Sequence, residues 1–207
     1  MTLNMLDKNS VQAGDVLLCF SSAMQGKGIV GIEYGYEHAA LGLENSKVLE
    51  ASAQGVAFTC IDKLLVVYEH IAILRAHGQW GAQRLNALRE FALENVGKKF
   101  NRSGMAKYAD RKKKYEDTAM ERVHQYFEGT EPPVSAHKEL YFCSELVLSA
   151  FISVGIIDES AAATLFTPET FSPEDIGKDK WFGFFIGYIV SHDQYQIPDN
   201  DMFRNLV

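Results

Sequence analysis

Short apolar runs separated by turn residues fill the first 76 residues, and their spacing limits the fold more than any other feature of the sequence. The runs lie at residues 15–20, 38–43, 47–51, 55–60 and 70–76. Each has the length of a β-strand, and the polar turn Glu44-Asn45-Ser46 has the length of a hairpin loop between the second and third runs. The first half of the chain is therefore predicted to form an antiparallel sheet.

The second half of the chain has helical periodicity. Residues 79–96 repeat apolar side chains near the helical spacing, and Gly97 stands where a helix is expected to end. A second apolar helix is predicted from Cys143 to Val154, and the aromatic run at 181–190 is predicted to be a final strand. This order indicates an α+β fold in which helices cover one side of an antiparallel sheet.

The length of 207 residues, of which 47% are hydrophobic, suits a single domain with one sizeable core. One stretch, at about 98–138, is polar and rich in lysine and contains Pro132-Pro133. It is predicted to be a mobile insertion beside the functional cleft, with a helix near 106–127. The domain is thus expected to span 1–207 with this insertion inside it.

The charge balance excludes some partners. A net charge of -7 and a pI near 5.4 disfavour nucleic acid and anionic membranes, which attract a clustered positive field. The basic run 111–114 is followed at once by Glu116 and Asp117, so a solvated helix face is favoured over a phosphate-binding patch. No apolar stretch has membrane-spanning length and no signal peptide is evident, so a cytoplasmic location, or export without a cleaved signal, is expected.

Cysteines and histidines lack the spacing of metal sites. Three cysteines, at 19, 60 and 143, favour free thiols over a disulfide framework or a structural zinc site. The histidines show no recognisable ligand pattern, so no metal and no cofactor are predicted. The segment Gly26–Gly31 matches G-x-G-x-x-G, but without a strand–helix context it predicts a flexible loop or short helix bordering the cleft rather than a dinucleotide site.

Cys143 stands immediately before an apolar helical run. A thiol at a helix N-terminus is favoured as the thiolate, which is the nucleophilic form, and the backbone N–H at this position could form half of an oxyanion hole. On the local pattern alone, a cysteine on an apolar helix is more often a small buried hydrophobic residue than a catalytic one. Cys143 is therefore a candidate nucleophile whose assignment depends on a partner base.

His38 and Glu50 supply candidate partners from the two strands of the predicted hairpin. The register of the hairpin places them nearly opposite one another, where a carboxylate can accept a hydrogen bond from an imidazole. A base held by a carboxylate is the second half of a cysteine triad. Taken singly, each residue is also typical of a solvated position at a strand end.

Four segments together resemble the circularly permuted branch of the NlpC/P60 papain-like superfamily, which includes the YiiX/YebB-like proteins and is similar to the lecithin:retinol acyltransferase group. The segments are Gly14-Asp15-Val16-Leu17-Leu18, Tyr36-Glu37-His38-Ala39-Ala40-Leu41, Val48-Leu49-Glu50-Ala51 and Tyr141-Phe142-Cys143-Ser144-Glu145-Leu146-Val147. The histidine precedes the cysteine, as in the permuted order. The resemblance implies a circularly permuted papain-like (NlpC/P60) fold with Cys143 as nucleophile, His38 as base and Glu50 as third polar residue.

The resemblance also implies a cysteine hydrolase, an amidase or endopeptidase, that acts on bacterial cell-wall peptides. Such a substrate lies outside the cytoplasm, so a toxin delivered by a secretion machine, with an immunity or secretion partner, is one expectation. A lipid or small-ester acyl hydrolase or acyltransferase, and a non-catalytic binding module on the same fold, remain alternatives. Tyr36, Glu37, Tyr141 and Glu145 flank the predicted triad and are candidate substrate-binding residues, although aromatic packing is an equal alternative for the two tyrosines.

Overall fold

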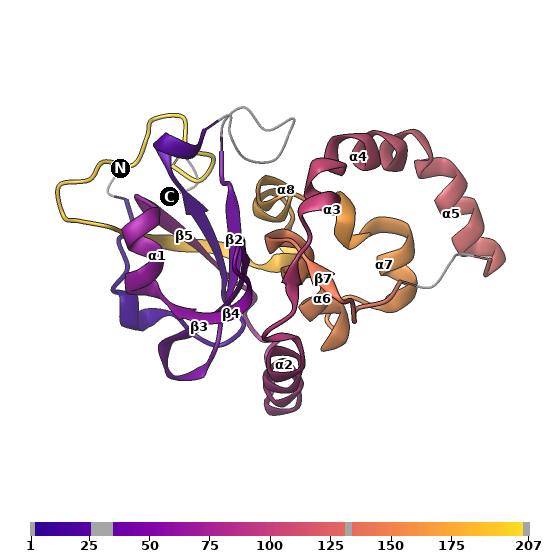
Figure 1. The fold of residues 1–207 in the computed structure, drawn as a ribbon, viewed down its shortest axis with the longest axis horizontal. Coiled ribbons are helices and arrows are strands. Elements are labelled where there is room, and N and C mark those ends of the chain that lie inside the picture. Colours follow the sequence, from indigo (N-terminus) through magenta and orange to yellow (C-terminus); the bar gives the residue numbers. More distant parts are fainter. Residues whose placement is uncertain (1–2, 26–34, 131–133, 205–207) are drawn as a thin grey trace.

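A six-stranded sheet organises the chain, which the computed structural model describes at residues 3–25, 35–130 and 134–204 (Figure 1). Its strands, in spatial order, are β4 (Gly55–Cys60), β3 (Lys47–Ser52), β2 (His38–Gly42), β1 (Val16–Phe20), β5 (His70–Arg75) and β8 (Phe184–Val190). All five neighbouring pairs are antiparallel. The predicted α+β class, with an antiparallel sheet, is confirmed.

Helices flank the sheet, and most lie to one side of it in Figure 1. They are α1 (Ile61–Val67), α2 (Ala82–Asn95), α3 (Arg102–Ala106), α4 (Tyr108–Asp117), α5 (Ala119–Glu128), α6 (Cys143–Ser153), α7 (Glu159–Leu165) and α8 (Pro173–Lys178). Short 3-10 turns are η1 (Lys8–Ser10), η2 (Ser22–Met24), η3 (Glu44–Ser46), η4 (Pro168–Thr170) and η5 (Lys180–Phe182). Within the described ranges, no helix is long and apolar enough to span a bilayer.

Both faces of the sheet are buried, which corrects the prediction that helices cover one side. Leu18 and its neighbours on one face join the large core that contains α6. Leu17 and Cys19, on the other face, pack with Ile61 and Leu64 of α1. The reason lies in β1, whose five residues are all apolar and buried, as expected for a strand covered on both faces. The short helix α1 was not predicted.

Residues 98–138 begin and end at a small parallel pair formed by β6 (Lys99–Phe100) and β7 (Leu140–Tyr141). The single helix predicted at 106–127 is two helices, α4 and α5, separated at Thr118. Asp175 of α8 accepts hydrogen bonds from Tyr108 at 2.8 Å and from Lys112 at 2.5 Å. These contacts fasten α4 to α8, so α4 is not a loose part of the segment.

A buried ion pair joins the start of β1 to the end of β5. Arg75 donates through Nε and Nη2 to the two carboxylate oxygens of Asp15, at 2.8 and 2.7 Å. Asp15 is almost fully buried and also accepts a hydrogen bond from the backbone N–H of Gln12. The bidentate geometry satisfies a carboxylate that would otherwise be costly to bury.

We therefore predict that Asp15→Ala lowers the free energy of unfolding by about 1.5–3 kcal/mol, because it removes the charge-assisted hydrogen bonds that Arg75 makes with this carboxylate. Asp62→Ala is the matched control, since it removes an exposed pair with Lys8 and is expected to leave the free energy of unfolding nearly unchanged. Urea unfolding of both variants checks the difference, and equal losses would contradict this role for the Asp15–Arg75 pair.

Candidate active site

Cys143 is the first residue of α6, at the end of the helix that faces the sheet strand β2. Glu145 accepts a hydrogen bond from the backbone N–H of Phe142 at 3.1 Å, which holds the first turn of the helix. The Cys143 side chain is 5% exposed, and its Sγ lies 4.0 Å from the carbonyl oxygen of Glu37. The predicted position of the thiol at a helix N-terminus is thus the one found in the structure.

His38 begins β2 and meets Glu50 of β3 on the same face of the sheet. The strands pair Ala40 with Glu50, so His38 and Glu50 are diagonal neighbours rather than directly opposite residues. The side chains still reach one another, with 2.9 Å between His38 Nε2 and Glu50 Oε2. The imidazole also stacks on Tyr68, with ring centroids 5.4 Å apart and an interplanar angle of 1°. Two neighbours therefore fix the ring orientation.

The Cys143 thiol and the His38 imidazole lie close enough for each to shift the pKa of the other. The Nε2 atom of His38 contacts Glu50, which leaves the other ring nitrogen, Nδ1, available for the thiol. The three residues thus form a chain of contacts from thiol to imidazole to carboxylate. They come from three elements, α6, β2 and β3, and the ends of this chain are 93 positions apart in the sequence.

Electrostatics favour the ionised form of the pair. Burial would lower the pKa of His38, but the hydrogen bonds and negative charges of Cys143 and Glu50 outweigh it and raise that pKa to about 9. Burial would likewise raise the pKa of Cys143, yet the His38 hydrogen bond and charge, with backbone N–H groups of Ala39 and Ser144, lower it. A lowered thiol pKa and a raised imidazole pKa both shift the pair toward thiolate and imidazolium.

The other two cysteines lack these features. Cys19 is fully buried, and burial raises its pKa well above that of an ordinary thiol. Cys60 is half-buried at the end of β4. Among the described residues, the Cys60 thiol makes no hydrogen bond to a histidine. Of the three thiols, Cys143 is the one that is both activated and paired with a base.

Glu37 lies between Tyr36 and the base, and its side chain is half-buried. Its carboxylate accepts hydrogen bonds from the backbone N–H of Ser21 at 3.1 Å and from the amide of Gln25. Burial raises the pKa of Glu37 to about 7, against the opposing effect of these hydrogen bonds. This carboxyl therefore changes charge near neutral pH, one residue from His38, and it remains a candidate for contact with a substrate.

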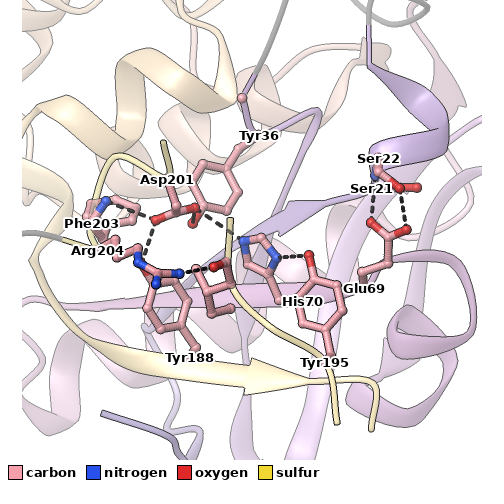
Figure 2. A network of polar contacts seen from close by, with 12 residues as sticks. Ser21, Ser22, Tyr36, Glu69, His70, Tyr188, Tyr195, Asp201, Phe203 and Arg204 are labelled. Carbon is pink, nitrogen blue, oxygen red and sulfur yellow. Dashed lines mark hydrogen bonds and ion pairs between the residues drawn. The ribbon is translucent and has the colours of Figure 1, made fainter. Parts of the chain in front are cut away.

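Tyr36 does not line a cleft, which corrects its prediction as a substrate-binding residue. Figure 2 shows it pointing into a buried polar network, where its hydroxyl donates to Asp201 at 2.7 Å and its side chain is 1% exposed. The same carboxylate contacts Tyr188 and lies 3.3 Å from His70 Nε2. This network ties the C-terminal segment to the chain just before β2, so Tyr36 has a structural role there.

Tyr141 and Glu145 are also structural in this arrangement, contrary to their prediction as substrate-binding residues. Tyr141 is fully buried and donates its hydroxyl to the carbonyl of Ala136 at 3.0 Å. Glu145 is 0% exposed and accepts hydrogen bonds from Lys138 at 2.9 Å and Asn101 at 3.2 Å. Neither side chain is accessible to a substrate, because both are enclosed by residues from outside α6.

Tyr68 and Gln25 were missed as neighbours of the site. Tyr68 follows the unpredicted helix α1, and no local pattern distinguishes it from other tyrosines. Gln25 bridges the carbonyl of Gly35 and the Glu37 carboxylate, across a stretch that includes the Gly26–Gly31 motif, which lies outside the described residues. Among the described residues, no group of three or more His, Cys, Asp or Glu side chains is placed to hold a metal ion.

We predict that iodoacetamide alkylates Cys143 first, with a rate that rises at a lower pH than the rate of an ordinary thiol. The reason is that the lowered pKa of Cys143 forms the thiolate at lower pH, whereas an ordinary thiol gains reactivity as pH rises toward about 8.5. His38→Ala is expected to slow the reaction at pH 6–7 about tenfold or more and to move the rise to higher pH. Mass spectrometry of the alkylated peptides gives the rates, and equal labelling of all three cysteines in the folded protein would contradict the ion pair.

We also predict that Glu50→Gln weakens the pair without unfolding the domain. The amide keeps the shape of the side chain but loses the charge that helps to raise the His38 pKa, so the thiolate fraction at neutral pH should fall. An activity loss of about tenfold to a thousandfold is expected, smaller than that of Cys143→Ala. Glu44→Gln is the matched control on the same hairpin, since Glu44 is exposed, and this substitution is expected to leave the activity unchanged. Unchanged rates in Glu50→Gln would mean that another group holds the ring.

Comparisons with known proteins add one structural likeness. A scan against protein-family models and a search of the curated proteins returned no match. Among solved structures, the chain is similar to the crystal structure described as metalloprotein YiiX from Escherichia coli O157:H7. The identity is 16%, over 87% of this chain and 88% of that chain, with a TM-score of 0.44.

Proposed function

We propose that this chain is a cysteine hydrolase that cleaves an amide through Cys143, His38 and Glu50. The single observation that carries the proposal is the placement of a helix-terminal thiol, whose pKa the neighbouring His38 lowers, beside a histidine whose Nε2 contacts a carboxylate. A cysteine that merely fills a core has a raised pKa, as Cys19 has. The pKa of Cys143 is shifted in the opposite direction, and the alternative of a non-catalytic binding module gives no reason for this lowered pKa.

In the proposed reaction, the Cys143 thiolate attacks the carbonyl carbon of the substrate, and the carbonyl π electrons move to oxygen. The backbone N–H of Cys143 contributes to the site that receives this oxyanion. His38, as imidazolium, donates its proton to the leaving nitrogen as the C–N bond breaks, which leaves a thioester on Cys143. Neutral His38 then takes a proton from water, hydroxide attacks the thioester, and the carboxylic acid departs as the thiolate re-forms.

Glu50 acts on the ring rather than on the substrate in this proposal. Its contact with Nε2 holds the tautomer and stabilises the imidazolium charge between the two transfer steps. Tyr68 supports the same orientation by stacking against the ring. The reactive nitrogen of His38 is thereby kept toward Sγ.

The permuted papain-like arrangement of the NlpC/P60 superfamily belongs to the same proposal. What supports it is an antiparallel sheet that carries the histidine and the carboxylate before a helix whose first residue is the cysteine. For the substrate we propose a bacterial cell-wall peptide. The acidic chain and the Glu37 carboxyl beside the site suit the cationic amine of a peptide better than an anionic lipid surface.

Incubation with defined muropeptides and, separately, with phosphatidylcholine vesicles tests this function. We expect peptide products that have gained one water by mass spectrometry, loss of these products in Cys143→Ala, and retention in Cys60→Ala, the matched control for removal of a thiol. Fatty-acid release that disappears in Cys143→Ala, with muropeptides intact, would instead support the lipid hydrolase alternative. Intact substrates of both classes, together with slow Cys143 alkylation, would overturn the hydrolase proposal.

A further inference from the structure

A cavity away from the triad collects positive charge in an otherwise acidic protein. It has a volume of about 580 Å³ and lies between α4, α5 and the segments that flank α6 and η4. Four cationic side chains line it: Arg111, Lys114, Arg122 and Lys138. Among the described residues, Glu169 is the one carboxylate in its wall. The net charge of the whole chain is -7, so this concentration of cations is local.

The four basic residues at 111–114 lie on α4, and their side chains have different surroundings. Lys112 pairs with Asp175 of α8, and Lys113 is exposed to solvent. Arg111 and Lys114, three positions apart on the helix, share one face and line the cavity. Within the described chain neither of these two has an ion pair. The solvated helix face predicted for the run therefore describes Lys113 and Lys114, which are exposed, whereas Arg111 and Lys112 are half-buried.

Arg122 brings a third cation from α5 and is held by neutral groups. Its Nε donates to the Thr164 carbonyl at 3.0 Å, and its Nη1 donates to Thr118 Oγ1 at 2.9 Å and to the Tyr115 carbonyl. The guanidinium also stacks on the Tyr115 ring, 3.4 Å from its centroid. In the described structure the Nη2 atom of Arg122 makes no hydrogen bond. The guanidinium is therefore held in place, has no carboxylate partner and keeps a free donor for a ligand.

Lys138 is the cation that is already neutralised. It contacts Glu169 and lies 2.9 Å from Glu145, which is buried behind it. Both carboxylates pair with Lys138, so Arg111, Lys114 and Arg122 have no carboxylate partner among the described residues, and the net charge of the six groups is +2. A phosphate group carries about -1.5 to -2 at neutral pH and accepts several hydrogen bonds at once, so it matches this surplus better than a single carboxylate does.

We propose that this cavity binds the phosphate group of a ligand, through Arg111, Lys114 and the free edge of Arg122. The phosphate replaces water on side chains from two helices, and the guanidinium of Arg122 is held in place before binding. The proposal does not depend on the thiol chemistry at Cys143, since none of these residues contacts the triad in the described structure. The source of the phosphate is either a soluble phosphorylated molecule or a lipid headgroup.

Isothermal titration of the full chain with inorganic phosphate, at constant ionic strength set with chloride, tests the site. We expect millimolar or tighter binding and a loss of about tenfold or more in affinity for the double variant Arg111→Gln/Lys114→Gln. Lys113→Gln is the matched control, since it removes one charge from the same helix outside the cavity, and it should bind as wild type does. Circular dichroism confirms that the variants keep the fold.

A second arm distinguishes the sources, using phosphatidylcholine vesicles with and without phosphatidic acid. Phosphate binding without retention on phosphatidic acid vesicles indicates a soluble ligand, and retention that the double variant loses indicates a headgroup. The site is overturned if wild type shows no binding in either arm, or if the double variant and Lys113→Gln bind equally. Cys143 alkylation should be unchanged in all these variants, so failure of this site and failure of the proposed hydrolase are separable.

Discussion

The packing of α6 against β2 determines where chemistry can occur in this chain. α6 is buried along its length and brings its first residue, Cys143, to the point where β2 begins with His38. A shift of one helical turn, about 5.4 Å, would break a contact that depends on hydrogen-bond distance. The apolar core between helix and sheet therefore sets the thiol–imidazole geometry, and the polar residues of the site rely on it.

Charge at the site follows from the same packing. Burial by itself would favour a neutral thiol and a neutral imidazole, and their direct contact reverses both tendencies because each ion stabilises the other. Glu50 adds a second negative group behind the ring. Glu37 brings a carboxyl that titrates near neutral pH to the same strand end. The activated thiol is a property of the cluster and not of Cys143 alone.

Polar networks elsewhere hold the strand end and helix end that form the site. The buried carboxylate of Asp201 fastens Tyr36, two residues before the base, to the C-terminal segment (Figure 2). Lys138 and Asn101 fix Glu145, which in turn holds the first turn of α6. The cavity near Lys138 lies beside this second network, and two of its cations, Arg111 and Lys114, have no ion-pair partner among the described residues.

Local patterns in the sequence determined much of this molecule. The apolar runs and turn residues specified the six strands, and the apolar period after Cys143 specified a helix that begins at the candidate nucleophile. The hairpin around Asn45 was enough to bring His38 and Glu50 within reach, because strand pairing over so short a loop leaves little freedom.

Only the tertiary structure decided which polar side chains are accessible and which partners they take. Tyr36 meets Asp201 across 165 positions, and Lys112 pairs with Asp175 whereas the adjacent Arg111 lines the cavity. The cover on the second face of the sheet, and the stacking of Tyr68 on His38, likewise depend on contacts between separate elements. The physical reason is that periodicity reports which face of an element is apolar, whereas the partner of a polar group is set by how whole elements pack.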